Sequence, residues 1–231
     1  IVSLNGDSYY CNRICAGGIL ALFAVDIQEG KNKDTAIIIQ RRSKKVSDEP
    51  GVYAVVPKAF HGFNIDSFNE VDPEYSVYRE CYEELFGGDD KPAEPGYVIH
   101  QFYKSLSPAM KDLMEKKGNN RDLKPLGIFW DLILGNFHVP FILHVKDPAW
   151  WTTHKDLLKV NWEVDEDVTP VIMLSETDKI IELLQEKKWA SDSFFTFTEG
   201  LRWLCQNKET QEAKKILRLL PKLKLNPLKT G

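Results

Sequence analysis

The sequence predicts an α+β domain in which helices lie on both sides of a mixed β-sheet, a three-layer α/β/α sandwich. Three observations lead to this class. The segment 14–27 is apolar on both faces, which is typical of a central strand that is covered from both sides. Two further strand-like segments, 126–134 and 137–146, are joined at Gly135-Asn136, which is a hairpin signal. Several other segments have the 3.6-residue apolar period of helices.

The composition is that of an ordinary globular protein with one large domain. The chain has 231 residues, of which 43% are hydrophobic and 28% are charged. The net charge of −4 argues against a surface for duplex nucleic acid, although not against nucleotides held through a metal ion. The four cysteines form no dense framework and no zinc pattern, so we expect free thiols in the reducing environment of the cytoplasm. No apolar run is long enough to suggest a membrane span.

Strand-like segments fill the first quarter of the chain. In order, they are 1–12, 14–27, 35–42 and 52–56. The third is a β-branched run, which favours a strand, and the fourth is short and ends at Pro57. The stretch 57–72 has no clean period and is expected to be irregular.

A helix is expected to follow this irregular stretch. Asp72 is a plausible N-cap, and Pro73 suits the first helical position because the N–H that proline lacks has no partner there. Gly87-Gly88 is expected to end the helix.

The second half of the chain is mainly helical by pattern. The helical segments are 97–117, with a break near Ser107-Pro108, then 175–187, 193–207 and the basic segment 209–220. Ser175 is expected to cap the second of these. Residues 118–122 are expected to be a loop, and 168–174 an edge strand because it contains a proline. The expected domains are 1–207, with the sheet and its helices, and 208–231, a basic helix and tail.

One face of the helix after Asp72 is strongly acidic. Glu80 and Glu84 lie one turn apart, and Glu83 falls on the same side. Like charges four residues apart weaken a helix, so we expect a cation to be held there. Mg²⁺ is the leading candidate because it takes oxygen ligands. Arg79 precedes Glu83 by four residues and is expected to bind its carboxylate.

This acidic segment resembles a known motif. The run Arg79-Glu80-Cys81-Tyr82-Glu83-Glu84-Leu85-Phe86-Gly87 is similar to the second half of the Nudix box, G-x5-E-x7-R-E-U-x-E-E-x-G-U, where U is a bulky aliphatic residue. The first half is longer here, because seven residues separate Gly62 from Glu70 and eight separate Glu70 from Arg79. The Nudix family therefore implies an α/β/α sandwich for this chain.

The resemblance covers about residues 52–88. Gly87 is interpreted as the glycine that closes the box. Cys81 stands in place of the first aliphatic residue, and Gly88 in place of the second. The preceding strand and loop, from Val55 to Gly62, are also similar to those of the family.

The resemblance implies a set of functional residues. In the family, carboxylates of this helix hold Mg²⁺ or Mn²⁺ ions that bridge a pyrophosphate. Carried over by position, Glu80 and Glu84 become the principal metal ligands, and Glu83 becomes a ligand or a group that supports them. Arg79 would orient Glu83, and the backbone carbonyl of Ala59 would add a further ligand.

The general base is expected outside the box, in an acidic segment beyond the hairpin. Glu163 is our choice, with Asp131 and Glu166 as the next candidates. The competing interpretation of the acidic run 161–167 is a solvated loop, which is at least as probable for any single member.

The implied function is hydrolysis of the pyrophosphate in a nucleoside diphosphate linked to another group. An ADP-ribose-like compound, an NAD-like compound, a nucleotide sugar and a dinucleoside polyphosphate all remain candidate substrates. The alternative is a Nudix-fold module that binds a nucleotide or a protein without catalysis. The partners expected are the nucleotide derivative and, because many relatives dimerise, a second copy of the chain. A larger parent protein is also compatible with the sequence.

Other features carry weaker hypotheses. His61, Arg41 and Arg42 are candidates for phosphate contacts, although ordinary surface positions are the more probable interpretation. Four tryptophans are candidates for base stacking, and for most of them core packing is favoured. They are Trp130, Trp150, Trp151 and Trp162.

Overall fold

The computed structural model of the chain describes residues 17–44, 50–60, 72–88, 106–115, 120–132, 135–158 and 171–222. The strands are β1 (Gly17–Glu29), β2 (Asn32–Arg41), β3 (Tyr53–Val55), β4 (Lys58–Phe60), β5 (Arg121–Pro125), β6 (Phe129–Asp131), β7 (Asn136–Val145) and β8 (Val171–Met173). The helices are α1 (Pro73–Phe86), α3 (Pro108–Glu115), α4 (Pro148–His154), α5 (Thr177–Gln185), α6 (Ser191–Gln206) and α7 (Gln211–Leu219). Short 3-10 turns occupy Lys155–Leu157 and Leu220–Lys222.

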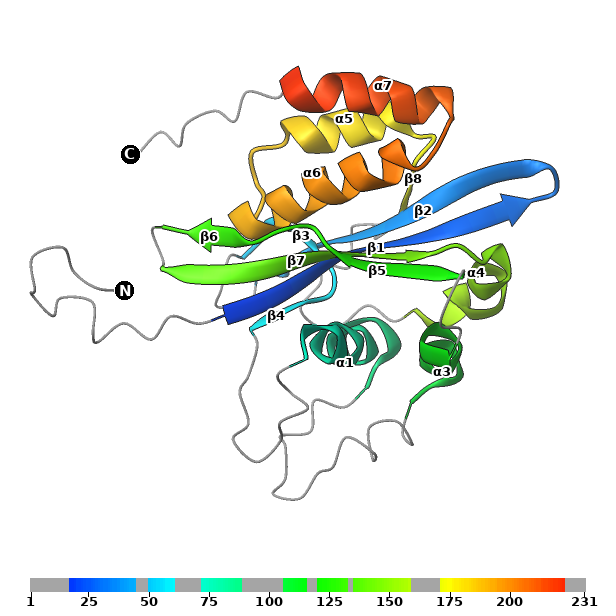
Figure 1. Cartoon of the computed structure of the whole chain (residues 1–231), viewed down its shortest axis with the longest axis horizontal. Helices are drawn as coiled ribbons and strands as arrows, with labels where there is room; N and C mark the ends of the chain where they lie inside the picture. The colour runs from blue at the N-terminus through cyan, green and yellow to red at the C-terminus, as the bar shows by residue number, and fades with distance from the viewer. Residues whose placement is uncertain are drawn as a thin grey trace, which may run out of the picture.

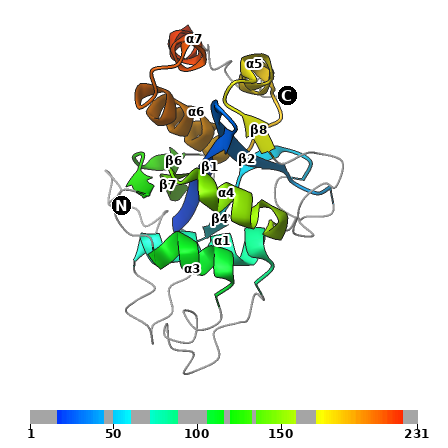
Figure 2. The same cartoon turned by 90° about the vertical axis from the view of Figure 1, so that its right-hand side faces the viewer.

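A mixed sheet lies between two layers of helices, as the sequence predicts. Helices α5, α6 and α7 lie on one face, and α1, α3 and α4 lie on the other (Figures 1 and 2). The strand order is β3-β2-β1-β7-β5, with β4 pairing β1, β6 pairing β7 and β8 pairing β2. Strands β1 and β7 run parallel, and the other pairs are antiparallel.

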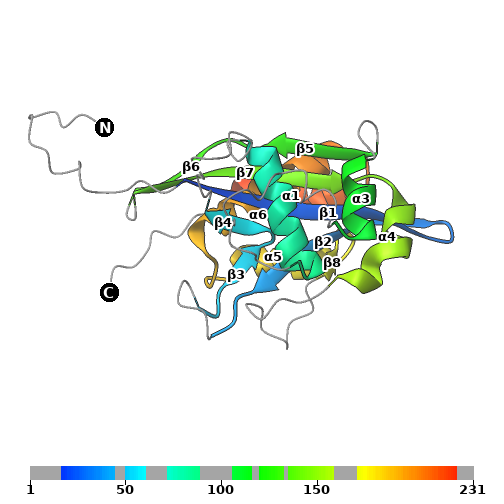
Figure 3. The same ribbon diagram turned by 90° about the horizontal axis from the view of Figure 1, so that it is seen from below.

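Strand β1 is central and buried on both faces, which explains its continuous apolar sequence. Ile19, Ala21, Phe23 and Val25 point into the core beneath α1, α3 and α4. The alternate residues Leu20, Leu22 and Ala24 point into the core beneath α5, α6 and α7. Figure 3 shows α1, α3 and α4 lying across the strands on the first of these faces.

Helix α1 begins and ends where the sequence predicts. The Asp72 carboxylate accepts a hydrogen bond from the Glu74 N–H at 2.9 Å, and Pro73 is the first helical residue. Gly87 has a φ of 65°, a left-handed conformation that favours glycine, and it closes the helix. The residues at the two ends of the acidic helix therefore mark its bounds.

Helix α4 was not predicted, although its start uses the same Asp-Pro signal. The Asp147 carboxylate accepts a hydrogen bond from the Ala149 N–H at 3.0 Å, and Pro148 is the first helical residue. Trp150 in this helix is 1% exposed and packs edge-on against Phe23 and Phe86. Its expected core role is confirmed.

Several strand and cap predictions were wrong in detail. Strand β5 lies partly in the expected loop 118–122, and the expected strand 126–134 is reduced to β6. The cause is tertiary, because both short strands pair with successive parts of β7. The irregular stretch 57–72 contains β4, whose polar and aromatic residues pair with β1. Ser175 does not cap α5; its N–H instead bonds the Asp34 carboxylate at 3.2 Å.

The hairpin and the late helices agree with the sequence more closely. Asp131 and Asn136 are paired where β6 turns into β7, and β8 is an edge strand. Helix α7 packs its buried Ala213 and Ile216 into the same core as α5 and α6, and the division between 1–207 and 208–231 stays a prediction. Across the part of the chain that the structure describes, no helix is both long and apolar enough to cross a membrane.

Candidate functional site

The acidic face of α1 gathers around Arg79. The guanidinium of Arg79 contacts the Glu80 carboxylate through Nη2, and Nη1 lies 3.2 Å from Glu83 Oε1. The side chain of Glu80 is only 9% exposed and that of Glu83 is 16% exposed, so both carboxylates are largely withdrawn from water. The predicted contact between Arg79 and Glu83 is therefore present, and Arg79 also forms an ion pair with Glu80.

The third carboxylate of α1 reaches a neighbouring strand. Oε2 of Glu84 accepts a hydrogen bond from the backbone N–H of Lys58 in β4 at 3.0 Å. Ala59, whose carbonyl is the other ligand expected from the resemblance, is the next residue along β4 and pairs with Ile19 of β1. The structure thus brings the end of the acidic helix to the backbone segment that precedes it.

The nearby carboxylates affect the pKa of the Cys81 thiol, which lies between Glu80 and Glu84 in the sequence. Burial first, and then the negative charges of Glu84 and Glu80, raise the pKa of the Cys81 thiol well above its usual value. Cys81 therefore stays protonated at neutral pH and acts as a small apolar residue in the core. The predicted substitution of an aliphatic position by cysteine is compatible with this burial.

The closing glycine of the motif requires a correction. Counted from Glu84, the pattern E-E-x-G places glycine at Phe86, and Gly87 is one residue late. Phe86 is 6% exposed and packs against Trp150, so this position is taken by a core aromatic residue. The helix consequently continues to Phe86, and the left-handed residue that ends it is Gly87.

The donor chemistry of α1 fits a hard divalent cation, because carboxylate oxygens are the ligands that such ions prefer. The present arrangement does not complete a metal-binding group. Among the described residues, no three His, Cys, Asp or Glu side chains are grouped so that they could hold a metal ion. In this arrangement Glu80 and Glu83 are turned toward Arg79.

A buried ion pair beneath β4 was missed by sequence reasoning. Nζ of Lys58 lies 3.1 Å from Asp192 Oδ2 in the first turn of α6, and Nδ1 of His138 in β7 lies 3.4 Å from the same oxygen. The side chains of all three residues are less than 10% exposed. No local pattern predicts the pair, because its two members are 134 positions apart in the sequence.

Other predicted residues fall in different places. Glu163, Glu166, His61 and Trp162 lie outside the described residues. Asp131 ends β6 at the hairpin. Nε of Arg41 donates to the Gly51 carbonyl at 3.2 Å, which is a structural contact. Trp130 is 49% exposed, so it is not among the tryptophans that pack in the core.

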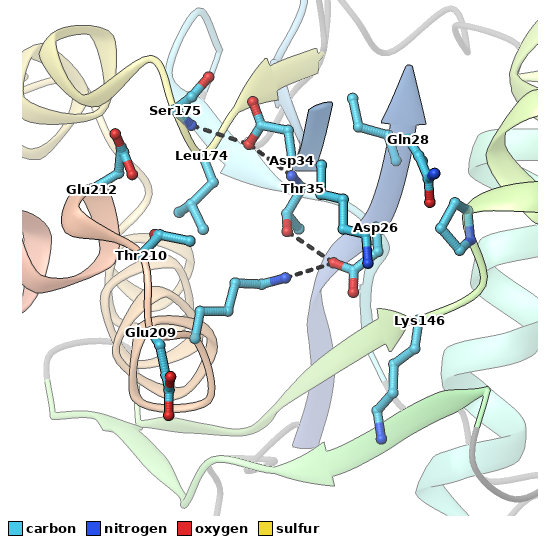
Figure 4. Close-up of a pocket in the computed structure, with 14 residues that line it drawn as sticks. Asp26, Gln28, Asp34, Thr35, Lys146, Leu174, Ser175, Glu209, Thr210 and Glu212 are labelled. Atoms are coloured by element: carbon cyan, nitrogen blue, oxygen red, sulfur yellow. Dashed lines mark hydrogen bonds and ion pairs between the residues drawn. The ribbon is translucent and has the colours of Figure 1, made fainter. Parts of the chain in front are cut away.

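An open cavity lined by described residues lies on the other face of the sheet. It has a volume of about 440 Å³ and lies between the β1–β2 hairpin, the β8–α5 turn and the segment joining α6 to α7 (Figure 4). Oδ1 of Asp26 accepts hydrogen bonds from Thr35 Oγ1 at 2.8 Å and Lys208 Nζ at 2.7 Å, and lies 2.9 Å from His144 Nε2. None of the residues predicted for catalysis or metal binding lines this cavity.

Comparison with known proteins gives a limited result. No family model matches the chain, and no curated protein matches it. Among solved structures, the chain is similar to a mutT/nudix family protein from Listeria innocua, with 14% identity, a TM-score of 0.47, and coverage of 84% of this chain and 98% of that one. It is also similar to the NUDIX domain of Shewanella oneidensis NrtR complexed with ADP ribose, with 12% identity, a TM-score of 0.40, and coverage of 87% and 96%. Because these TM-scores are below 0.5, a functional assignment depends on the residues of the chain.

Proposed function

We propose that the chain is a metal-dependent pyrophosphohydrolase of the Nudix class, which acts on a nucleoside diphosphate linked to another group. The observation that best supports this proposal is the contact between α1 and β4. Glu84 contacts the Lys58 N–H beside Ala59, while Arg79 holds Glu80 and Glu83 on the same helix. The residues that the motif selects are therefore neighbours in space as well as in sequence.

Each residue has a role in this proposal. Glu80 and Glu84 would hold the cation with the carbonyl of Ala59, and Arg79 would orient Glu83. A bound Mg²⁺ or Mn²⁺ would neutralise the charge of the pyrophosphate and lower the pKa of a bound water. Glu163 is the proposed general base, with Asp131 and Glu166 as the next candidates. The substrate is proposed only as a class, because the described residues of α1 and β4 select no base or sugar.

The test is release of phosphate esters from ADP-ribose, NAD⁺, dinucleoside polyphosphates, nucleotide sugars and 8-oxo-dGTP. We expect turnover of at least one compound with Mg²⁺ or Mn²⁺ and none in EDTA. Glu84→Gln should lower kcat/KM by on the order of 10³-fold, because a lost metal ligand removes several kcal/mol of transition-state stabilisation. Glu209→Gln, in the cavity on the opposite face, is the matched control and should change kcat/KM by less than about twofold.

A second candidate function is a binding module that holds a nucleotide without cleaving it. The observation that favours it is the double contact of Arg79, which offsets part of the negative charge of Glu80 and Glu83 without a metal. Binding of a panel compound without turnover, under all metal conditions, would favour this function. Turnover that persists in EDTA or in Glu84→Gln would contradict the proposed hydrolase.

A further inference from the structure

Lys58 makes contacts in two opposite directions. Its backbone N–H donates to Glu84 of α1, on one face of the sheet, at 3.0 Å. Its ammonium group pairs with Asp192 at the start of α6, on the other face, at distances of 3.2 Å to Oδ1 and 3.1 Å to Oδ2. One residue of a three-residue strand therefore joins both helical layers.

The ion pair is well placed to hold this strand. The Lys58 side chain is 9% exposed and that of Asp192 is 7% exposed, so solvent screens their attraction weakly. Asp192 lies in the first turn of α6, where the helix dipole favours a negative charge, and its Oδ1 also accepts the Ser193 N–H at 2.6 Å. The Asp192 carboxylate is thus held by the neighbouring backbone as well as by Lys58.

Close packing restricts the same segment from the side of β1 and β7. A Cβ built on Gly18 would lie 2.1 Å from His138 Cδ2 and 3.0 Å from the carbonyl oxygen of Ala59. His138 in turn lies against Asp192. The carbonyl proposed as a metal ligand therefore lies close to Gly18, which also lies against His138.

We propose that the Lys58–Asp192 ion pair is a positioning device that fixes the β4 backbone and, through the Lys58 N–H, orients the carboxylate of Glu84. Lys58 and Asp192 are positioning residues, because neither is assigned a contact with substrate or metal. The consequence for metal binding rests on the proposed function. The effect on the Lys58–Glu84 hydrogen bond does not.

The first test is hydrogen exchange of the amide at position 58, measured by NMR. The variants are Lys58→Met and Asp192→Asn, together with the double variant, which removes both buried charges and avoids leaving one unpaired. We expect exchange at position 58 to accelerate by more than about tenfold in all three, relative to amides in the middle of β1. Lys58→Arg keeps the charge and should retain most of the protection.

Lys208→Met is the matched control. It removes another lysine that pairs with an aspartate, Asp26, at 2.7 Å on the cavity side of the molecule, where both side chains are more exposed than those of Lys58 and Asp192. It should leave exchange at position 58 unchanged. Unchanged exchange in the folded double variant, or equal acceleration in Lys208→Met, would overturn the proposal.

The second test is Mn²⁺ binding, measured by calorimetry without substrate. Lys58→Met should raise the dissociation constant by about tenfold, the size expected for a group that supports a metal ligand, and Lys208→Met should not. If the unmodified chain binds no Mn²⁺ and hydrolyses nothing, the proposed function fails, and the exchange result still decides the positioning proposal. If Mn²⁺ binds equally to both lysine variants and to the unmodified chain, the link to the metal site is wrong.

Discussion

The acidic face of α1 and the carboxylate of Asp26 lie on opposite faces of one sheet, and they differ in the groups that contact them. On α1, the carboxylates of Glu80 and Glu83 contact the guanidinium of Arg79, and that of Glu84 accepts the N–H of Lys58. On the other face, the carboxylate of Asp26 accepts hydrogen bonds from Thr35 and Lys208 and also contacts His144.

The difference indicates what each region is for. Burial raises the pKa of Asp26, but the hydrogen bonds and charges of His144 and Lys208 outweigh it and lower the value to about 2. A carboxylate with such strong donors stabilises the fold. Three neighbouring carboxylates on one helix face repel one another, and we expect such a cluster to be kept for a ligand, in the usual trade between stability and activity.

The largest stability effect is expected at Asp26. Asp26→Asn should lower the free energy of unfolding by about 2 kcal/mol, because Lys208 and His144 lose a charged acceptor while remaining partly buried. Urea unfolding at pH 7, followed by circular dichroism, measures the change. A decrease in the free energy of unfolding of less than about 0.5 kcal/mol would contradict a stabilising role for Asp26.

The contribution of Asp26 should also depend on pH in a defined direction. Its folded pKa of about 2 lies below the ordinary value of 3.8, so the ionised group stabilises the folded chain above about pH 4. This contribution, about 1–2 kcal/mol at a site partly open to solvent, is lost as the pH falls toward 2. The stability difference between the unmodified chain and Asp26→Asn should therefore shrink from pH 5 to pH 2. A difference independent of pH would contradict the cause given for the low pKa.

The smallest expected effect has the opposite sign. Glu84→Gln should leave the metal-free chain unchanged or stabilise it by up to about 0.5 kcal/mol, because it removes one of two like charges a turn apart. The amide oxygen can still accept the Lys58 N–H. Thermal unfolding in EDTA measures the change, and a loss comparable to that of Asp26→Asn would mean that the two regions do not differ as described.

The parts of the molecule that could be predicted depend on local chemistry. The bounds of α1 follow from Asp72, Pro73 and Gly87, which act within a few residues of themselves. The Arg79–Glu83 contact follows from helical spacing. The central place of β1 follows from a run that is apolar on both faces.

The parts that could not be predicted depend on pairing between distant segments. Strand β5 forms because β7 is beside it, not because Arg121–Pro125 favours a strand. The partners of Asp26 come from positions up to 182 residues away, and those of Lys58 from 26 and 134 residues away. The signal for α4, in contrast, was present in Asp147-Pro148 and could have been found by analogy with Asp72-Pro73.

Direct titration with Mn²⁺ tests the central claim, that the carboxylates of α1 hold a divalent cation. The proposed site predicts binding by the unmodified chain, a dissociation constant raised by more than about tenfold in Glu80→Gln and Glu84→Gln, and no change in Glu212→Gln from the opposite cavity. Binding that is absent, or that weakens equally in Glu212→Gln, would contradict it.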